Sequence, residues 1–348
     1  LQWYLGWLAD AMVNSFIARK DLDTEMTVVR NEMERGENQP DSVLLHETMA
    51  AMYDWHNYGK STIGARSDVE NVDIPRLQAF YRLYYQPDNA TLIVSGKFEP
   101  ATVLARVADT FGKIPKPTRK LPIQYTLDPA QDGERSVTVR RSGGAPVLFA
   151  GYHVPAGSAP DFAAVEVLAL IFGDAPSGRL HKRLTEHQLA SSVFAFAWAL
   201  AEPAVLITGA ELAPGMDVDK ARDGLLAVDE SLAREPITAE ELTRARTKWL
   251  NGWDQSFTNP ERVGIALSES VAQGDWRLFF LTRDRVRDVT LAEVQRVADQ
   301  YLVSSNRTLG TYLPTDAPVR APAPAKVDLA KTMQDFKPQA AAAKVEAF

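Results

Sequence analysis

The stretch Val69-Glu-Asn-Val-Asp73 returns 217 residues later as Val286-Arg-Asp-Val-Thr290, and this recurrence decides the expected fold. Further identities follow at the same offset and without a gap: Tyr84 with Tyr301, Asn89 with Asn306, and Thr91-Leu92 with Thr308-Leu309. A match at one fixed spacing indicates that a structural unit occurs twice along the chain. The sequence therefore predicts two similar domains.

The composition is that of an ordinary globular protein. The 348 residues are 45% hydrophobic and 24% charged, which excludes a disordered chain. A net charge of −7 and the lack of a long basic run argue against nucleic acid as a partner. No apolar stretch approaches the roughly 18 residues of a membrane span. Because cysteine is absent, any metal must be bound by His, Asp or Glu.

The order of predicted elements indicates an α+β fold. We expect two homologous domains, each a mainly antiparallel sheet with helices packed on one face, in residues 1–128 and 129–315. A Pro/Ala-rich linker tail occupies residues 316–348. Only 20 residues precede Asp21, whereas about 100 precede its counterpart Thr238 in the second copy. We therefore expect the first domain to be truncated, with roughly 80 of its residues upstream of Leu1.

In the first copy, the expected elements include a helix that Asp73 caps and a strand over residues 90–96. Asn89 and Asn306 each begin a glycosylation acceptor pattern. Their identical placement before a strand in both copies favours a different interpretation, a turn asparagine followed by a β-forming residue.

Two glutamates of the first copy, Glu25 and Glu32, are the best candidates for chemistry. Seven residues span about 10 Å of helix axis and return to nearly the same face. At the repeat offset the second copy carries Leu242 and Trp249 instead. We expect that apolar face to be buried, so carboxylates at the same face of the first copy need charge partners. A divalent cation or a buried arginine would satisfy them.

Four stretches in order resemble the pitrilysin/insulinase family of zinc metallopeptidases. They are Glu25-Met-Thr-Val-Val-Arg-Asn-Glu32, Tyr58-Gly-Lys-Ser-Thr-Ile-Gly64, Tyr85-Gln-Pro-Asp-Asn-Ala-Thr-Leu-Ile-Val-Ser-Gly96 and Ser177-Gly-Arg-Leu180. In that family a His-x-x-Glu-His motif supplies two zinc ligands and a general base. Its third ligand is a glutamate about 75 residues further on. The resemblance implies that Glu32 is this ligand and that Glu25 is the supporting acid seven residues before it.

The resemblance also implies the activity of the intact protein. It would be a zinc metalloendopeptidase that cleaves peptides or small unfolded proteins, in which zinc polarises the scissile carbonyl and its bound water. Its two homologous halves, or two partner subunits, would close like a clam shell around the peptide substrate.

The printed chain departs from the family pattern in one respect. Its five histidines, His46, His56, His153, His181 and His187, form no His-x-x-Glu-His or His-Glu-x-x-His. The family motif would lie upstream of Leu1, so we expect this chain alone to bind no stoichiometric zinc and to be inactive. The alternative is a non-catalytic family member that serves in peptide binding or assembly.

Overall fold

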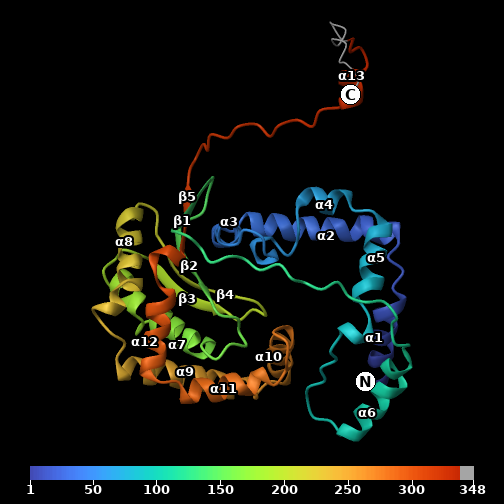
Figure 1. The fold of residues 1–348 in the computed structure, drawn as a ribbon, viewed down its shortest axis with the longest axis horizontal. Helices are drawn as coiled ribbons and strands as arrows, with labels where there is room; N and C mark the ends of the chain where they lie inside the picture. Colours follow the sequence, from blue (N-terminus) through green and yellow to red (C-terminus); the bar gives the residue numbers. More distant parts are fainter. Residues whose placement is uncertain (338–348) are drawn as a thin grey trace, which may run out of the picture.

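The computed structural model describes residues 1–337, and its first 113 residues contain helices and no strand (Figure 1). The α-helices of this part are α1 (Gln2–Asn14), α2 (Arg19–Glu37), α3 (Pro40–Met52), α4 (Arg66–Asn71), α5 (Ile74–Tyr84) and α6 (Pro100–Asp109). Single 3₁₀ turns lie between them, namely η1 (Asn57–Gly59), η2 (Pro87–Asn89) and η3 (Phe111–Lys113).

All five strands lie in the second part of the chain. They are β1 (Arg135–Arg141), β2 (Val147–Val154), β3 (Ser192–Trp198), β4 (Ala204–Glu211) and β5 (Arg307–Pro314). They form one sheet in the order β1-β5-β2-β4-β3, in which only the β1–β5 pair is parallel. The predicted α+β class with a mainly antiparallel sheet is therefore confirmed.

The helices of the second part cover one face of this sheet (Figure 1). They are α7 (Phe162–Gly173), η4 (His181–Thr185), α8 (Val218–Asp229), η5 (Ser231–Ala233), α9 (Ala239–Ser256), α10 (Pro260–Ala272), α11 (Leu278–Asp288), α12 (Leu291–Tyr301) and η6 (Ser304–Asn306). Side chains alternate across a strand, so Leu148 and Ala150 of β2 face this helical layer. Most of α7 is buried there, as its nearly continuous apolar sequence predicts.

The other face of the sheet is covered in part by α3, which comes from the first copy. Val147 and Phe149 of β2 point to this side and pack with Leu44 and Met52 of α3. The expectation that helices lie on one face thus describes the helices of the second domain. It omits α3, because packing between elements that are about 100 residues apart leaves no local sequence signal.

The two copies have equivalent elements at one pair of helices, although β5 has no counterpart strand in the first copy. At the 217-residue offset α5 coincides with α12 and η2 with η6, each with the same length. The side chains of Asp73 and Thr290 cap the two helices, accepting from Arg76 N at 2.8 Å and from Glu293 N at 3.3 Å. These caps explain why both helices begin at equivalent residues.

The asparagines of the two acceptor patterns make equivalent turn contacts. Asn89 Nδ2 donates to Tyr84 O at 3.0 Å, and Asn306 Nδ2 donates to Tyr301 O at 2.8 Å. Each bond satisfies the last turn of the preceding helix. This geometry confirms the interpretation of both residues as turn asparagines.

The predicted strand over residues 90–96 is wrong. The backbone is extended at Ala90, with φ −135° and ψ 145°, yet no described strand lies beside it. A strand requires ladder hydrogen bonds to a neighbour, which extended sequence cannot supply alone. The segment instead lies against α10, where Ser95 Oγ donates to Pro260 O at 2.6 Å.

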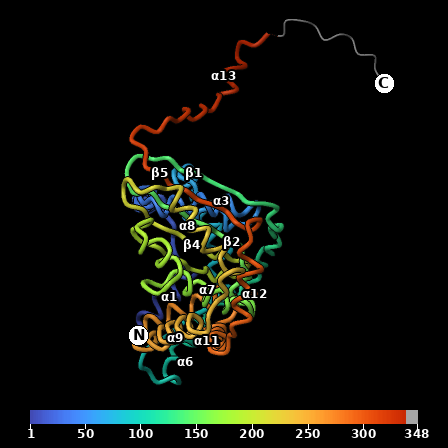
Figure 2. The backbone as a smooth tube through the Cα atoms, turned by 90° about the vertical axis from the view of Figure 1, so that its left-hand side faces the viewer, coloured from blue at the N-terminus to red at the C-terminus, as the bar shows by residue number. Residues whose placement is uncertain are grey.

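The end of the chain leaves the folded part after β5 (Figure 2). It runs as an exposed Pro/Ala-rich segment to the short helix α13 (Leu329–Met333). This agrees with a linker composition. Across residues 1–337 we find no helix with the length and apolar character needed to span a bilayer.

Candidate functional site

Glu25 and Glu32 both project from α2 into solvent. The helix packs sparingly, with Met33 as its only buried residue. On one side of this helix, Arg66 of α4 forms an exposed ion pair with Glu34 at 3.2 Å. Glu34 lies off the face of Glu25 and Glu32, so this ion pair leaves the two candidate carboxylates free of α4.

The corresponding face of α9 is covered. Leu242 is 7% exposed, and Trp249 packs against the same core, which confirms the predicted burial of this face. The covering element is α7, whose buried Glu166 lies close to Trp249. Burial raises the pKa of the Glu166 carboxyl to about 7, although the nearby Trp249 opposes the shift.

The described residues do not assemble a zinc site. Among residues 1–337 no group of three or more His, Asp or Glu side chains lies close enough to share a metal ion. Structural and catalytic zinc sites need at least three protein ligands, whereas Glu32 offers one carboxylate. The five histidines lie elsewhere, at α3 (His46), η1 (His56), β2 (His153), η4 (His181) and the turn after it (His187).

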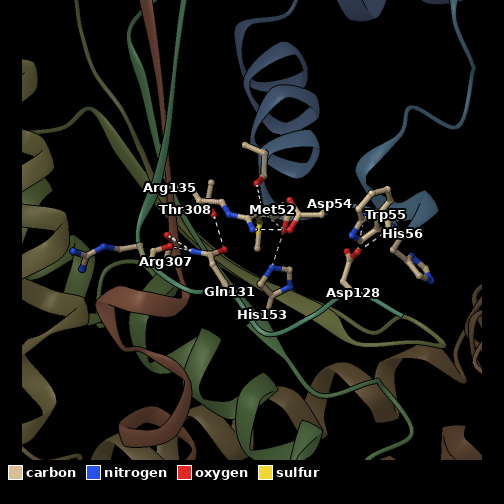
Figure 3. Close-up of polar contacts among 12 residues, drawn as sticks. Met52, Asp54, Trp55, His56, Asp128, Gln131, Arg135, His153, Arg307 and Thr308 are labelled. Carbon is tan, nitrogen blue, oxygen red and sulfur yellow. Dashed lines mark hydrogen bonds and ion pairs between the residues drawn. The ribbon is translucent and has the colours of Figure 1, made fainter. Parts of the chain in front are cut away.

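A polar cluster joins the two copies where the chain passes from one to the other (Figure 3). Arg135 at the start of β1 binds Asp54 through two hydrogen bonds of 2.9 and 2.8 Å. The same guanidinium donates to Ala51 O and Met52 O at the end of α3. His153 Nε2 lies 3.1 Å from Met52 O. A bidentate Arg–carboxylate pair fixes both position and orientation, so this clamp sets α3 on the sheet.

Asp128 anchors the connecting segment to the same loop. Its Oδ1 accepts from Trp55 N at 2.7 Å and from His56 N at 3.1 Å. Three residues later, Gln131 donates to Arg307 O at 2.7 Å and accepts from Thr308 Oγ1. The connector is thereby attached to the first copy at one residue and to β5 at another (Figure 3).

Asp128 and Gln131 of the connector, together with His56 and His153, line a cavity of ≈ 550 Å³. Its walls include Tyr53, His56, Asp128, His153 and Tyr301. Burial raises the pKa of the Tyr53 phenol and lowers that of His153, so both side chains are neutral at neutral pH. The sequence does not reveal this cluster, because its contacts join residues that are more than 70 positions apart and match no motif.

Comparison with known proteins identifies the fold and its relatives. The description "Peptidase M16 inactive domain" matches residues 71–248, just over half of the chain. The zinc protease PqqE of Helicobacter pylori is 25% identical over 308 residues, which cover 87% of this chain and 69% of that protein. A Helicobacter pylori protease structure superposes with a TM-score of 0.85 at 24% identity, covering 90% of this chain and 77% of that one.

The structure also resembles the first half of a larger protein. The first half of the periplasmic protease PqqL from Escherichia coli superposes with a TM-score of 0.71 at 16% identity, covering 90% of this chain and 71% of that one. Against the whole PqqL structure, the chain covers 36%. At this identity the likeness shows the fold alone. Taken with the matched residues 71–248, the chain belongs to the M16 family of zinc metallopeptidases, the pitrilysin/insulinase family.

Proposed function

We propose that this chain is part of a zinc-dependent metalloendopeptidase that hydrolyses peptide bonds in peptides or small unfolded proteins. In this proposal Glu32 is a zinc ligand and Glu25 positions the ligand set. The single observation that carries the proposal is the contrast between the α2 and α9 faces. Equivalent positions hold two exposed carboxylates in one copy and two packed apolar side chains in the other.

The covering helix of the second copy suggests how the site would be completed. There α7 packs on the face of Leu242 and Trp249 and brings Glu166 to Trp249. A helix placed in the same way on α2 would bring its side chains to Glu32. The family's His-x-x-Glu-His motif lies on a helix, so its two imidazoles and Glu32 would give the three protein ligands of a catalytic zinc.

The described residues alone do not fit zinc, and we assign no catalytic step to them. A zinc ion held by Glu32 and two imidazoles would supply Lewis-acid chemistry for peptide hydrolysis. The contribution of this chain is a carboxylate at Glu32, and a second one at Glu25 that would orient the first ligand shell through hydrogen bonds.

The proposal is tested by three single variants of the intact protein. Glu32→Gln should lose most zinc and lower kcat/KM by more than about 100-fold, because a neutral amide is a poor ligand. Glu25→Gln should keep zinc nearly stoichiometric and lower kcat by about tenfold or more. Glu34→Gln carries the same charge change on the same helix and serves as the matched control, with zinc and activity retained. Metal analysis and peptide hydrolysis provide the two measurements.

The alternative is a non-catalytic subunit that binds peptides or assists assembly. It is supported by the match to an inactive domain and by the single candidate ligand among residues 1–337. If the parent protein hydrolyses no peptide and both Glu25→Gln and Glu32→Gln retain full zinc, the carboxylates are structural and this alternative holds.

A further inference from the structure

The connector contains an Asp-Gly pair, Asp132-Gly133, whose reactive groups are both free. Gly133 lies outside helix and strand, and its N–H donates to no residue in the described range 1–337. The exposed carboxylate of Asp132 has no hydrogen-bond or ion-pair partner in the same range. A Cβ added at Gly133 would meet no atom within 4 Å, so no side chain shields this peptide bond. A free aspartyl carboxyl can therefore react with the backbone nitrogen that follows it.

This reaction converts the Asp132–Gly133 peptide bond into an isoaspartyl bond. The Gly133 nitrogen forms a bond to Cγ of Asp132, and the amide hydrogen leaves with the hydroxyl of the protonated carboxyl as water. Water then adds to the main-chain carbonyl carbon of the resulting five-membered ring, and the bond from that carbon to the nitrogen breaks. The chain afterwards runs through Cβ and Cγ, with a carboxylate on Cα. Solvent water is the only co-reactant.

The other Asp-Gly pair of the chain is protected by its helix. Gly224 follows Asp223 inside α8, where its N–H donates along the helix, and it packs against Leu184. The related pair Asn251-Gly252 lies inside α9. In both helices the glycine nitrogen must give up its hydrogen bond before it can attack, which requires local unfolding. The fold thus leaves the connector pair as the most reactive of the three.

Both sides of the reactive bond are attached to β5. Gln131 donates to Arg307 O at 2.7 Å (Figure 3) and to Gly133 O at 2.8 Å. Glu134 accepts from Arg307 Nε at 2.7 Å, and β1 begins at the next residue, Arg135. An isoaspartyl bond lengthens the backbone between these attachments by one carbon and removes the native position of Gly133 O. The product therefore cannot keep all of these contacts.

We propose that Asp132-Gly133 is a site of spontaneous isoaspartate formation and that the product loosens the connector from the start of β5. The site lies at the junction of the two copies, so the modification changes how the second sheet holds the connector. This inference is independent of the proposed peptidase activity.

Heavy-oxygen labelling of the full chain tests the reaction. The folded chain is incubated in water enriched in oxygen-18 and then digested with trypsin in ordinary water, which gives peptides 121–135 and 223–234, one for each Asp-Gly pair. Peptide 121–135 should gain the label at least about tenfold faster than peptide 223–234. In concentrated urea the two rates should become similar, because the helix no longer protects Gly224. Equal labelling of the two peptides in the folded chain would overturn the proposal.

A variant and a second measurement test the site and its consequence. Asp132→Glu keeps the charge but requires a six-membered ring, so peptide 121–135 should lose its labelling while peptide 223–234 keeps its own rate. In the separated isoaspartyl form, the amides at the start of β1 should exchange with deuterium about fivefold faster, the effect of losing one hydrogen bond, with α7 unchanged. Labelling that persists in Asp132→Glu would refute the site. Unchanged exchange in β1 would refute the loosening of the connector.

Discussion

The outer face of α2 and the inner face of α9 occupy equivalent places in the two copies but meet opposite surroundings. On α9 the face is packed under α7, and its residues are Leu242 and Trp249. On α2 the same positions are Glu25 and Glu32, which are exposed in the described part of the chain. Equivalent positions of two equivalent helices therefore lie in different environments, and each carries the residue type that suits its own environment.

The largest loss of stability is expected for a substitution on the covered face of α9. Leu242→Gln places an unsatisfied amide in a packed core and should lower the free energy of unfolding by about 4 kcal/mol. Glu25→Gln, at the equivalent position of the first copy, should change it by less than about 0.5 kcal/mol in this chain. Urea denaturation of both variants measures the contrast. Equal losses would show that the two faces are buried alike.

A second contrast concerns the helices that follow α2 and α9. Leu44 of α3 is completely buried against the sheet, whereas Ile265 of α10 is 56% exposed. Leu44→Ala should therefore cost about 3 kcal/mol through lost burial and the resulting cavity. Ile265→Ala is the matched control and should cost less than about 1 kcal/mol. A small loss for Leu44→Ala would mean that α3 is not held on the second sheet in solution.

In a third contrast the buried carboxyl lies in the second copy and the apolar residue in the first. Asp229 of α8 is 1% exposed, and at the repeat offset the first copy carries Met12. Burial raises the pKa of Asp229 to about 7, although hydrogen bonds from Tyr152 and Thr208 oppose the shift. The folded state thus holds a proton that the unfolded state releases near pH 4. Its contribution to stability is complete below about pH 4 and is lost as the pH rises to about 7.

Replacing this carboxyl should flatten the pH dependence. Glu166 adds a loss of the same sign, so the parent's stability should fall through this window by both contributions. In Asp229→Asn the fall between pH 5 and pH 8 should be smaller by about 2 kcal/mol. Urea midpoints at the two pH values measure it. Identical slopes in parent and variant would show that Asp229 ionises normally.

The sequence predicted those features of the fold that depend on local chemistry. Helices α5 and α12 and their turns follow from the caps Asp73 and Thr290 and from a repeated asparagine, all within a few residues of one another. The burial of Leu242 was predicted because Leu242 and Trp249 are apolar residues on the same face of one helix. Residues 90–96 were predicted wrongly as a strand, because a strand is defined by a partner that lies elsewhere.

The junction between the copies could not be predicted in this way. The Asp54–Arg135 clamp and the contacts of Asp128 join residues separated by more than 70 positions, and a single Asp or Arg carries no pairing signal. The same holds for the candidate zinc ligand. Glu25 and Glu32 were identified only because the second copy has apolar residues, Leu242 and Trp249, at the equivalent positions.

The smallest loss of stability is expected for substitutions at the turn asparagines Asn89 and Asn306. Asn306 Nδ2 donates to Tyr301 O and also to His153 O at 2.9 Å on β2, whereas the equivalent Asn89 has only its Tyr84 contact among the described residues. One such hydrogen bond contributes about 1 kcal/mol. Asn89→Ala should therefore lower the free energy of unfolding by about 0.5–1 kcal/mol and Asn306→Ala by about twice as much. Urea denaturation of the two variants gives the ratio. Because the extra bond of Asn306 ties the turn to the sheet, equal losses would mean that this bond contributes nothing and that the two turns differ only in their surroundings.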